Sequence, residues 1–569
     1  MVQQQIEKLV RAAIKKEFGD FGVPEIVVER PVEKTYGDYS TNIALQIAKE
    51  LKKNPLEIAK KVAGGIGQHS LFEKIEAASP GFINFYLSRD FFKDTVKEVL
   101  KHPKIFGRNN ILKDKKVIVE YTDPNPFKVF HIGHLSNNST GESISRIIEF
   151  QGGNVKRANY QGDVGLHVAK AIWGVMDIRK HRNSSFDFDS LKDFSAGYAY
   201  GSQAYESDGD IKKEIIEINR KIYDKSDKGI NKLYEEGRKV SLKEFEKIYK
   251  KLGTKFDYYF FESKIATFGK RVVEDGLKKG IFEKGERGAT IFKGEKLGLH
   301  TRVFINSEGL ATYEAKELGL AKIKYDKFKY DVSIIVTGNE IIEYFKVVLG
   351  AMTEMFPELA KKTKHIWHGM LRLPEGKMSS RTGNVVTFEF LFEEVKKIVS
   401  GKIEARKFTE REKNEIAEKV AIGAIKYSIL KQSIGSDIIY NIEKSISFEG
   451  DSGPYLQYSL VRALSVLEKA KVEKIKPLFK DLPDKITDLE KMLCRFPEIA
   501  AKAGQEYEPH LITTYLTELA REFNNYYANN KIVEKNDEFS PYKIAITKAF
   551  SIIMKNGLWL LGIPAPEKM

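Results

Sequence analysis

The feature that most constrains the fold is an alternation of strand, loop and helix signals in residues 115–160. KKVIVEY (115–121) is a short β-branched run typical of a buried parallel strand, and the loop TDPNPFKVF (122–130) follows it. Residues 131–153 then have helical character and end at a Gly-Gly pair, and GNVKRANY (153–160) is a second strand signal. This order is that of a βαβ unit, so we predict an α/β fold with a doubly wound, Rossmann-like parallel sheet.

The signals elsewhere divide the chain of 569 residues into three predicted domains. Residues 1–106 form a small α+β domain, in which residues 21–31 are expected to be a strand. Residues 107–395 form the α/β domain, with a charge-rich, largely helical insertion at about 175–300. Residues 396–569 have helical periodicity throughout and form an all-helical domain.

The charge balance indicates contact with a polyanion. Lys and Arg number 94 against 79 Asp and Glu, which gives a formal net charge of +15. Such a charge attracts phosphate backbones, although many basic proteins bind no polyanion. The hydrophobic fraction of 42% is close to the globular average and argues against a disordered chain.

The single cysteine, Cys494, excludes an intramolecular disulfide and a zinc site built on paired thiolates. It lies in a helical stretch, and we expect a small buried hydrophobe there rather than a nucleophile. No apolar run is long enough to span a bilayer, and the first residues lack the apolar core of a signal peptide. We therefore predict a cytoplasmic protein without membrane contact.

Two local motifs carry the chemistry. His131-Ile132-Gly133-His134 opens the first α/β helix, where two imidazoles three residues apart lie beside unsatisfied N–H groups that suit a nucleotide phosphate. Gly376–Asn384 (GKMSSRTGN) combines glycines, two cations and two hydroxyls, as a loop that grips a polyphosphate would. Alone, the first could be a pair of solvated or core histidines and the second a surface turn; together they are far more specific.

The paired motifs resemble those of the class I aminoacyl-tRNA synthetases, and the flanking residues resemble the arginyl-tRNA synthetases. VEYTDPNPFKVFHIGHL is similar to that family's VEFSSPN-x-x-K-x-x-H-x-GHL, and NYQGDVG to its N-x-x-GDWG, with Val164 at the usual Trp position. Segments at 29–31, 37–42 and 79–85 resemble the family's added N-terminal domain. SFEGDSGPYLQYSLVRA (447–463) and the last residues resemble its anticodon-binding domain, so the match covers all three regions.

The resemblance implies a reaction and its participants. The family condenses arginine with ATP and Mg²⁺ to arginyl-adenylate, then esterifies tRNA(Arg), and most members need bound tRNA before they activate arginine. It implies catalytic roles for His131, His134, Lys128, Lys377 and Arg381. It implies ATP contacts for His131, Gly133, His134, Gly162, Asp163, Lys377, Met378, Ser379 and Ser380, and no resident metal site. We expect a monomer.

Two departures from the family pattern concern charge. The usual motif has a second lysine where this chain has Ser380 followed by Arg381, and Lys128 is the candidate substitute. The alternative is that Lys128 only extends from its loop into solvent. By register, the arginine-binding residues are Glu120, Asn125, His131, Tyr313, Glu317, Asn339 and Glu340, with Glu317 at the usual Asp and Asn339-Glu340 in the SQQ segment. Glu317 and Glu340 could instead be solvated helix charges.

Aromatic and amide side chains in the last domain could stack on and read anticodon bases. By register with the family, the candidates are Tyr455, Gln457, Tyr458, Arg462, Asn525 and Met569. Aromatic residues in a helix are more often part of the core. The leading hypothesis is an arginine–tRNA ligase; the alternatives are a catalytically silent tRNA-binding paralogue and another class I specificity.

Overall fold

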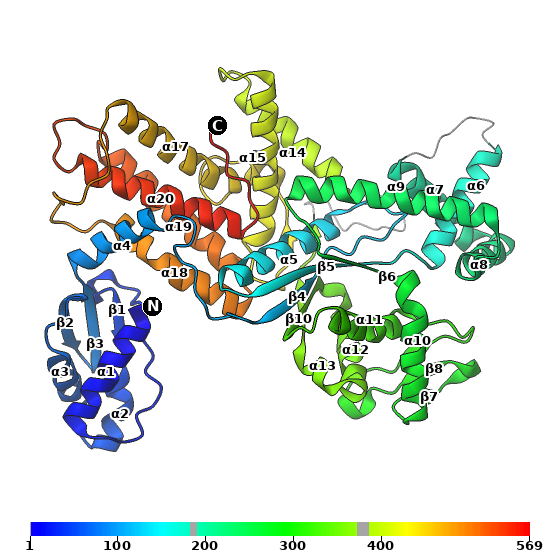
Figure 1. The fold of residues 1–569 in the computed structure, drawn as a ribbon, viewed down its shortest axis with the longest axis horizontal. Coiled ribbons are helices and arrows are strands. Elements are labelled where there is room, and N and C mark those ends of the chain that lie inside the picture. Colours follow the sequence, from blue (N-terminus) through cyan, green and yellow to red (C-terminus); the bar gives the residue numbers. More distant parts are fainter. Residues whose placement is uncertain (1, 182–189, 373–385) are drawn as a thin grey trace. The chain divides into compact units, whose positions relative to one another are not determined.

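The computed structural model describes residues 2–181, 190–372 and 386–569, which divide into two compact units (Figure 1). The first comprises residues 1–107, 459–499 and 518–556. The second comprises residues 108–458, 500–517 and 557–569. Among the described residues, every helix is too short or too polar to cross a bilayer.

The N-terminal part of the first unit is a three-stranded antiparallel sheet with helices packed against it. The sheet has the order β1-β3-β2. Its buried core includes Ile6, Val10, Ile43 and Phe85. The elements are α1 (Val2–Phe18), β1 (Tyr39–Thr41), α2 (Ile43–Leu51), α3 (Pro55–Ile66), β2 (Phe72–Ala78), β3 (Phe82–Leu87) and α4 (Arg89–Lys101).

The predicted strand at residues 21–31 is wrong except at one position. Glu29 and Ser40 exchange backbone hydrogen bonds of 2.9 and 2.7 Å, and the rest of the segment joins no sheet. Pro24 and Pro31 lack the N–H group that a ladder needs, so the segment is extended without pairing.

Four long C-terminal helices contribute residues to both units: α17 (Gly453–Val472), α18 (Asp488–Glu506), α19 (His510–Asn529) and α20 (Ser540–Leu560). In the first unit, Cys494 of α18 is 9% exposed and packs into the N-terminal core, which confirms the expectation of a buried hydrophobe. Glu490 of α18 accepts hydrogen bonds from Arg89 and from Tyr542 (2.6 Å).

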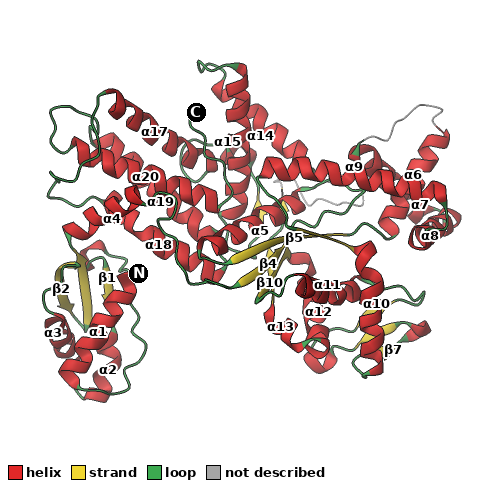
Figure 2. Cartoon of the chain, viewed as in Figure 1, coloured by secondary structure: helices red, strands yellow, loops and turns green. Residues whose placement is uncertain are grey.

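A five-stranded parallel sheet forms the centre of the second unit and confirms the predicted fold class (Figure 2). Its order is β11-β10-β4-β5-β6, and all neighbouring strands are parallel. The strands are β4 (Lys116–Glu120), β5 (Asn154–Gln161), β6 (Tyr258–Phe261), β10 (Val332–Gly338) and β11 (Thr363–His368). Helix α5 (Ile132–Phe150) connects β4 to β5, as the βαβ signal predicts.

The insertion is largely helical: α6 (Leu166–His181), α7 (Leu191–Ser207), α8 (Gly209–Asp224), α9 (Lys228–Leu252) and, after a strand, α10 (Glu262–Lys278). The strand between α9 and α10 is β6 of the main sheet, which the sequence did not predict. A small antiparallel sheet of order β7-β8-β9 follows α10. Its strands are β7 (Glu283–Lys284), β8 (Thr290–Phe292) and β9 (Arg302–Ile305).

Helices complete the second unit. The remaining elements are α11 (Tyr313–Lys327), α12 (Ile342–Met355), α13 (Pro357–Lys362), the paired short strands β12 (Leu371–Arg372) and β13 (Ile438–Ile439), α14 (Phe388–Ile403), α15 (Glu410–Leu430) and α16 (Ile442–Ser445). Short 3-10 helices occupy Lys34–Tyr36, Glu286–Gly288, Glu295–Leu297 and Asn339–Ile341.

Candidate active site

The two histidines of the first motif cap helix α5. His131 is the N-cap residue, and its Nδ1 accepts hydrogen bonds from the backbone N–H groups of Gly133 (3.1 Å) and His134 (3.4 Å). The Nδ1 of His134 in turn accepts from the backbone N–H of His131 at 3.2 Å. The two rings are stacked, with centroids 3.6 Å apart. This reciprocal arrangement is a capping box in which both side chains are imidazoles.

Both imidazoles are therefore neutral hydrogen-bond donors. Because each Nδ1 accepts a backbone N–H, the proton of the neutral ring is on Nε2. Burial, and then the charge of Lys128, lower the pKa of His131 to about 4. Burial, His131 and Lys128 together lower the pKa of His134 well below its usual value. The pair offers N–H groups near the positive end of the helix dipole without adding positive charge of its own.

The loop between β4 and α5 is anchored to the end of β5. Asp123 Oδ1 accepts from the backbone N–H of Tyr160 at 2.7 Å, and Asn125 Oδ1 accepts from that of Gly162 at 3.1 Å. The φ angles of Thr122 (82°) and Asp123 (46°) are positive, so the backbone turns sharply as it leaves the strand. The carboxyl end of a strand next to a helix start is where α/β folds bind ligands.

A cavity of about 630 Å³ opens at this edge of the sheet. It is lined by eight of the predicted residues, namely Glu120, Asn125, His131, Gly133, His134, Tyr313, Glu317 and Glu340. It is also lined by residues that sequence analysis did not single out, including Thr122, Asp123, Asn137, Tyr160, Thr337, Tyr344, His368 and Arg372.

One side of the cavity is acidic. Glu120, at the end of β4, is 2% exposed and accepts a hydrogen bond from the buried Nζ of Lys324 at 2.8 Å. Burial lowers the pKa of Lys324, but Glu120, Tyr330 and Glu317 together outweigh that effect and leave the pKa above its usual value. Glu317 lies nearby, and burial together with Glu120 raises its pKa to about 8. A cationic ligand suits such a surface.

Four described residues of the predicted ATP, arginine and catalytic sets lie outside this lining. Asp163 is fully buried and accepts hydrogen bonds from Arg238 Nε (2.9 Å) and from Ser263 N (2.9 Å) and Oγ (2.8 Å). Its carboxylate therefore has a structural role in this structure, and its contact with ATP stays a prediction. Gly162 contacts Asn125 instead of the cavity.

Asn339 is likewise not a cavity residue. Its Nδ2 donates to Asp437 Oδ1 at 3.3 Å, so the amide is turned toward β13. Lys128 also lies outside the lining, with its Nζ 4.5 Å from the ring centroid of Tyr198 on α7. Its charge nevertheless acts on both histidines through their pKa values.

The second motif lies outside the described residues, and with it Lys377, Met378, Ser379, Ser380 and Arg381. The segments on either side of residues 373–385 are described. Arg372 lines the cavity, and Val386 O accepts from the backbone N–H of Ile132 at 3.2 Å. Phe388 N donates to Phe130 O at 2.9 Å, which pairs the start of α14 with the start of α5.

Comparison with known proteins identifies the family. A family model described as the catalytic domain of class I (R) tRNA synthetases matches residues 95–442. The chain belongs to the arginyl-tRNA synthetase family. The arginyl tRNA synthetase N-terminal domain model matches residues 4–87, and the DALR anticodon binding domain model matches residues 456–569.

Relatives of this arginyl-tRNA synthetase family member match it along its length. The arginine–tRNA ligase of Halothermothrix orenii is 32% identical over 578 residues, covering 99% of each chain. That of Clostridium perfringens is 31% identical over 576 residues, covering 100% of this chain and 97% of the relative. The solved arginyl-tRNA synthetase of Thermus thermophilus matches with a TM-score of 0.80 and 25% identity, covering 100% of both chains.

The predicted anticodon-facing residues of this synthetase family member have different exposures. Asn525 is exposed, whereas Tyr455, Tyr458, Arg462 and Met569 are partly buried. Gln457 is fully buried, and its Nε2 donates to the backbone oxygens of Lys419 (3.0 Å) and Pro564 (2.7 Å). Its amide thus contributes to the packing of α15 against the C-terminal segment, and a contact of Gln457 with an anticodon base stays a prediction.

Several cavity residues of this arginyl-tRNA synthetase family member were not predicted from the sequence, and most of them lie near the ends of parallel strands. Asp123 and Tyr160 lie just after or at the ends of the strands β4 and β5, and Thr337 and His368 lie near the ends of β10 and β11. The carboxyl ends of parallel strands meet at one edge, so polar residues there were the available signal. Tyr344 and Asn137 lie within helices and carry no such positional signal.

Proposed function

We propose that this protein ligates arginine to its tRNA through an arginyl-adenylate, with ATP as the energy source. The observation that carries the proposal is the acidic cavity beside the imidazole-capped start of α5, in a chain that matches arginine–tRNA ligases over its whole length. The enzyme class and its substrates follow from the family, and the residue roles below are proposals.

The cavity supplies positioning and charge rather than a nucleophile. In the first step the arginine carboxylate attacks the α-phosphorus of ATP, and pyrophosphate leaves with the electron pair of the broken bond. The Nε2–H groups of His131 and His134 donate to the phosphate oxygens, and the adjacent N–H groups of α5 add their dipole. Lys128, Lys377 and Arg381 neutralise the charge on pyrophosphate.

Mg²⁺ would be bound chiefly through the ATP phosphates. Among residues 2–181, 190–372 and 386–569, no three His, Cys, Asp or Glu side chains are grouped as metal ligands. Mg²⁺ prefers several oxygen ligands and keeps some of its water, so the ATP phosphates and solvent could supply its ligands.

The acidic side of the cavity takes the arginine. Glu120 and Asn125 suit the ammonium and carboxylate end of the amino acid, since one is an anion and the other an amide. Tyr313, Glu317 and Glu340 suit the guanidinium, whose planar fork favours carboxylate acceptors. An acidic cavity of this kind disfavours neutral and acidic amino acids.

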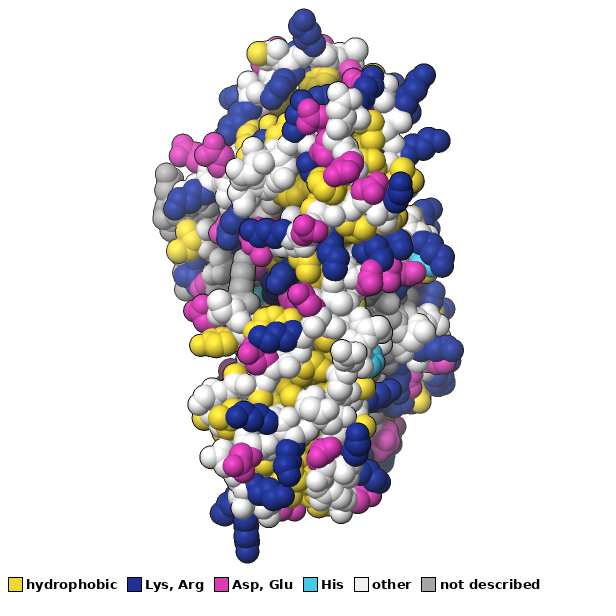
Figure 3. Space-filling view, turned by 90° about the vertical axis from the view of Figure 1, so that its left-hand side faces the viewer, with side chains coloured by type: hydrophobic (Ala, Val, Ile, Leu, Met, Phe, Trp, Pro, Cys, Tyr) yellow, Lys and Arg dark blue, Asp and Glu magenta, His cyan; other side chains and the backbone are white. Residues whose placement is uncertain are grey.

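The partner tRNA would contact basic surface and the two terminal domains. Lys and Arg side chains spread over the face shown in Figure 3, with Asp and Glu among them. Asn525, Tyr455, Gln457, Tyr458, Arg462 and Met569 remain the proposed anticodon-facing residues. The three-domain division at 1–106, 107–395 and 396–569 stays a proposal; the catalytic-domain model runs to residue 442, past the proposed boundary at 395. A monomeric state and a cytoplasmic location remain predictions.

An aminoacylation assay tests the proposal. The purified chain is offered each of the twenty amino acids separately, with ATP, Mg²⁺ and total tRNA. We expect charging with arginine alone. Charging with a different amino acid would favour another class I specificity. Binding of tRNA without any charging would favour a silent paralogue, so either result would contradict the proposal.

A further inference from the structure

Three carboxyl groups lie on the acidic side of the cavity, under the electrostatic influence of one buried cation. Glu120 ends β4, Asp123 lies in the loop after it, and Glu317 lies on α11; all three line the cavity. The buried cation among them is Lys324, whose Nζ is 2.8 Å from Glu120 Oε2. Three ionised carboxylates and one ammonium would leave a surplus negative charge in a largely buried place, which is costly.

The three carboxyl groups differ in their partners. Glu120 has Lys324, and Asp123 accepts a backbone hydrogen bond from Tyr160 at 2.7 Å. No hydrogen-bond donor or cation contacts the Glu317 carboxyl within the described part of the chain. The hydroxyl of Tyr160 is buried in the same region and has no partner among the described residues, and Tyr160 itself is only 9% exposed. Unsatisfied polar groups in a cavity lining mark a place that a ligand completes.

Resting on the function proposed above, we propose that arginine enters this cluster in exchange for a proton. The guanidinium replaces the proton on the Glu317 carboxyl, and that proton leaves to solvent. The O–H bond breaks with its electron pair remaining on the carboxylate. Because a neutral acid becomes an anion as the cation arrives, the net charge of the cluster does not change.

The surroundings of Glu317 support this exchange. Burial and the Glu120 carboxylate raise the pKa of Glu317 to about 8. Two further carboxylates near it are already compensated: Glu314 pairs with Arg302 (3.1 Å) and Glu262 with Lys316 (2.6 Å). The other groups that face it are Lys324 on its own helix, Tyr160 on β5 and Tyr344 on α12.

The assignment to Glu317 rests on a contrast with Asp123. Burial and Glu120 raise the pKa of Asp123 well above its usual value, although the Tyr160 N–H opposes that shift. The Asp123 carboxyl is held by that N–H at 2.7 Å, whereas the Glu317 carboxyl has no such donor among the described residues, so we assign the exchanged proton to Glu317. Citrulline, a neutral isostere of arginine, cannot supply the charge that displaces it.

Isothermal titration calorimetry of the full chain with arginine measures the exchange. The titration is run at about pH 7 in phosphate and in imidazole, whose ionisation enthalpies differ. The slope of observed enthalpy against buffer ionisation enthalpy gives the protons released. With a pKa of about 8 for Glu317, we expect about 0.9 proton per arginine. Citrulline should bind far more weakly and release none.

Two variants locate the proton. Glu317→Gln should release almost none and should bind arginine about tenfold or more weakly, because the amide adds no charge. Asp326→Asn is the control on the same helix, since Asp326 pairs with Lys322 and Lys329 away from the cavity; it should release as much as the unaltered chain. If Glu317→Gln does not fold, the unaltered chain decides, because its proton count should fall to about one quarter at about pH 8.5.

Equal heats of arginine binding in the two buffers would overturn the proposal, and so would undiminished proton release by Glu317→Gln. Either result can coexist with normal charging of tRNA with arginine, so the proposed function would stand. Failure of arginine to bind at all, with charging of another amino acid, would instead overturn both.

Discussion

At the scale of single residues, the two capping histidines are neutral, so they can supply hydrogen bonds to a ligand but no positive charge. His131 and His134 use Nδ1 to hold the first turn of α5 and present Nε2–H outward from the backbone they cap. In the proposed mechanism they contribute directed hydrogen bonds, while Lys128 and the cations of the second motif contribute charge. Under that proposal, different side chains orient the phosphates and neutralise them.

His134→Ala should lower adenylate formation about 10²- to 10³-fold, because it removes a donor aimed at developing charge. His134→Gln should lose less, since its amide N–H reaches a similar position to Nε2–H. Both are measured by arginine-dependent pyrophosphate exchange in the presence of tRNA, with tRNA affinity as the control that should hardly change. Undiminished exchange by the alanine variant would contradict the catalytic role.

At this scale, sequence predicted residues whose role follows from a local motif. The histidine pair and Glu120 lie where the motif register predicts, because strand, loop and helix start are continuous in sequence. Gln457 and Asp163, which the motif register assigned to ligands, also make internal hydrogen bonds that the register did not indicate. Their partners lie far along the chain, and no pattern in one sequence indicates which hydrogen bonds a buried amide or carboxylate will make.

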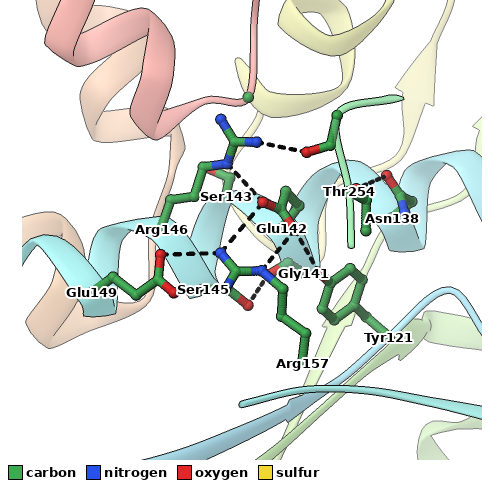
Figure 4. A network of polar contacts seen from close by, with 12 residues as sticks. Tyr121, Asn138, Gly141, Glu142, Ser143, Ser145, Arg146, Glu149, Arg157 and Thr254 are labelled. Carbon is green, nitrogen blue, oxygen red and sulfur yellow. Dashed lines mark hydrogen bonds and ion pairs between the residues drawn. The ribbon is translucent and has the colours of Figure 1, made fainter. Parts of the chain in front are cut away.

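At the scale of elements, helix α5 is fixed on its polar side by a buried charge network (Figure 4). Glu142 accepts from Tyr121 (2.5 Å), Arg146 (2.7 Å) and Arg157 (3.0 Å), which join α5 to β5 and to the end of β4. Arg146 also donates to the backbone oxygen of Gly253 at 2.8 Å. The helix that carries the histidine pair is thus held to the sheet and to the segment after α9.

Lys426 of α15 extends this packing. It is fully buried, and its Nζ donates to the backbone oxygens of Leu252 (2.6 Å) and Gly562 (3.0 Å). Burial, and then Arg146, lower the pKa of Lys426 to about 7. Between about pH 7 and the usual lysine pKa, the unfolded chain binds more protons than the folded one, so this group stabilises the fold more as pH rises.

Lys426→Met should therefore lower the thermal midpoint, and the deficit relative to the unaltered chain should grow from pH 7 to pH 9. Expressed as free energy of unfolding, the deficit grows by at most about 1.4 kcal/mol per pH unit. Thermal unfolding followed by circular dichroism at several pH values measures it, with the exposed Lys419→Met on the same helix as control. A deficit that does not change with pH would contradict a largely neutral buried lysine.

Helices and strands with a regular spacing of apolar residues were predictable from sequence. Those that form only because a segment distant in sequence pairs with them were not. The βαβ unit and the C-terminal helices follow from their apolar spacing. Strand β6 has only four residues and becomes a strand because β5 offers it an open edge, with Gln161 opposite Phe261. Residues 21–31 have strand-like composition, but their two prolines prevent a continuous ladder.

At the scale of the whole molecule, the net charge of +15 should make tRNA affinity depend on salt. Affinity is expected to fall about tenfold or more between 50 and 200 mM salt, because each phosphate contact releases counterions. Fluorescence anisotropy with labelled tRNA at several salt concentrations measures the slope. Non-cognate tRNA should show a similar slope, since backbone contacts carry no sequence information. Salt-independent binding would contradict this.

The N-terminal core has a consequence for the order in which the protein is made. Nearly all of its buried residues lie between Ile6 and Phe92, but Cys494 joins the same core, and Glu498 accepts a hydrogen bond from Arg30 at 3.1 Å. A nascent chain can assemble the early sheet soon after it leaves the ribosome. The apolar face that receives Cys494 then stays open through most of translation, so this core can close only after α18 has been synthesised.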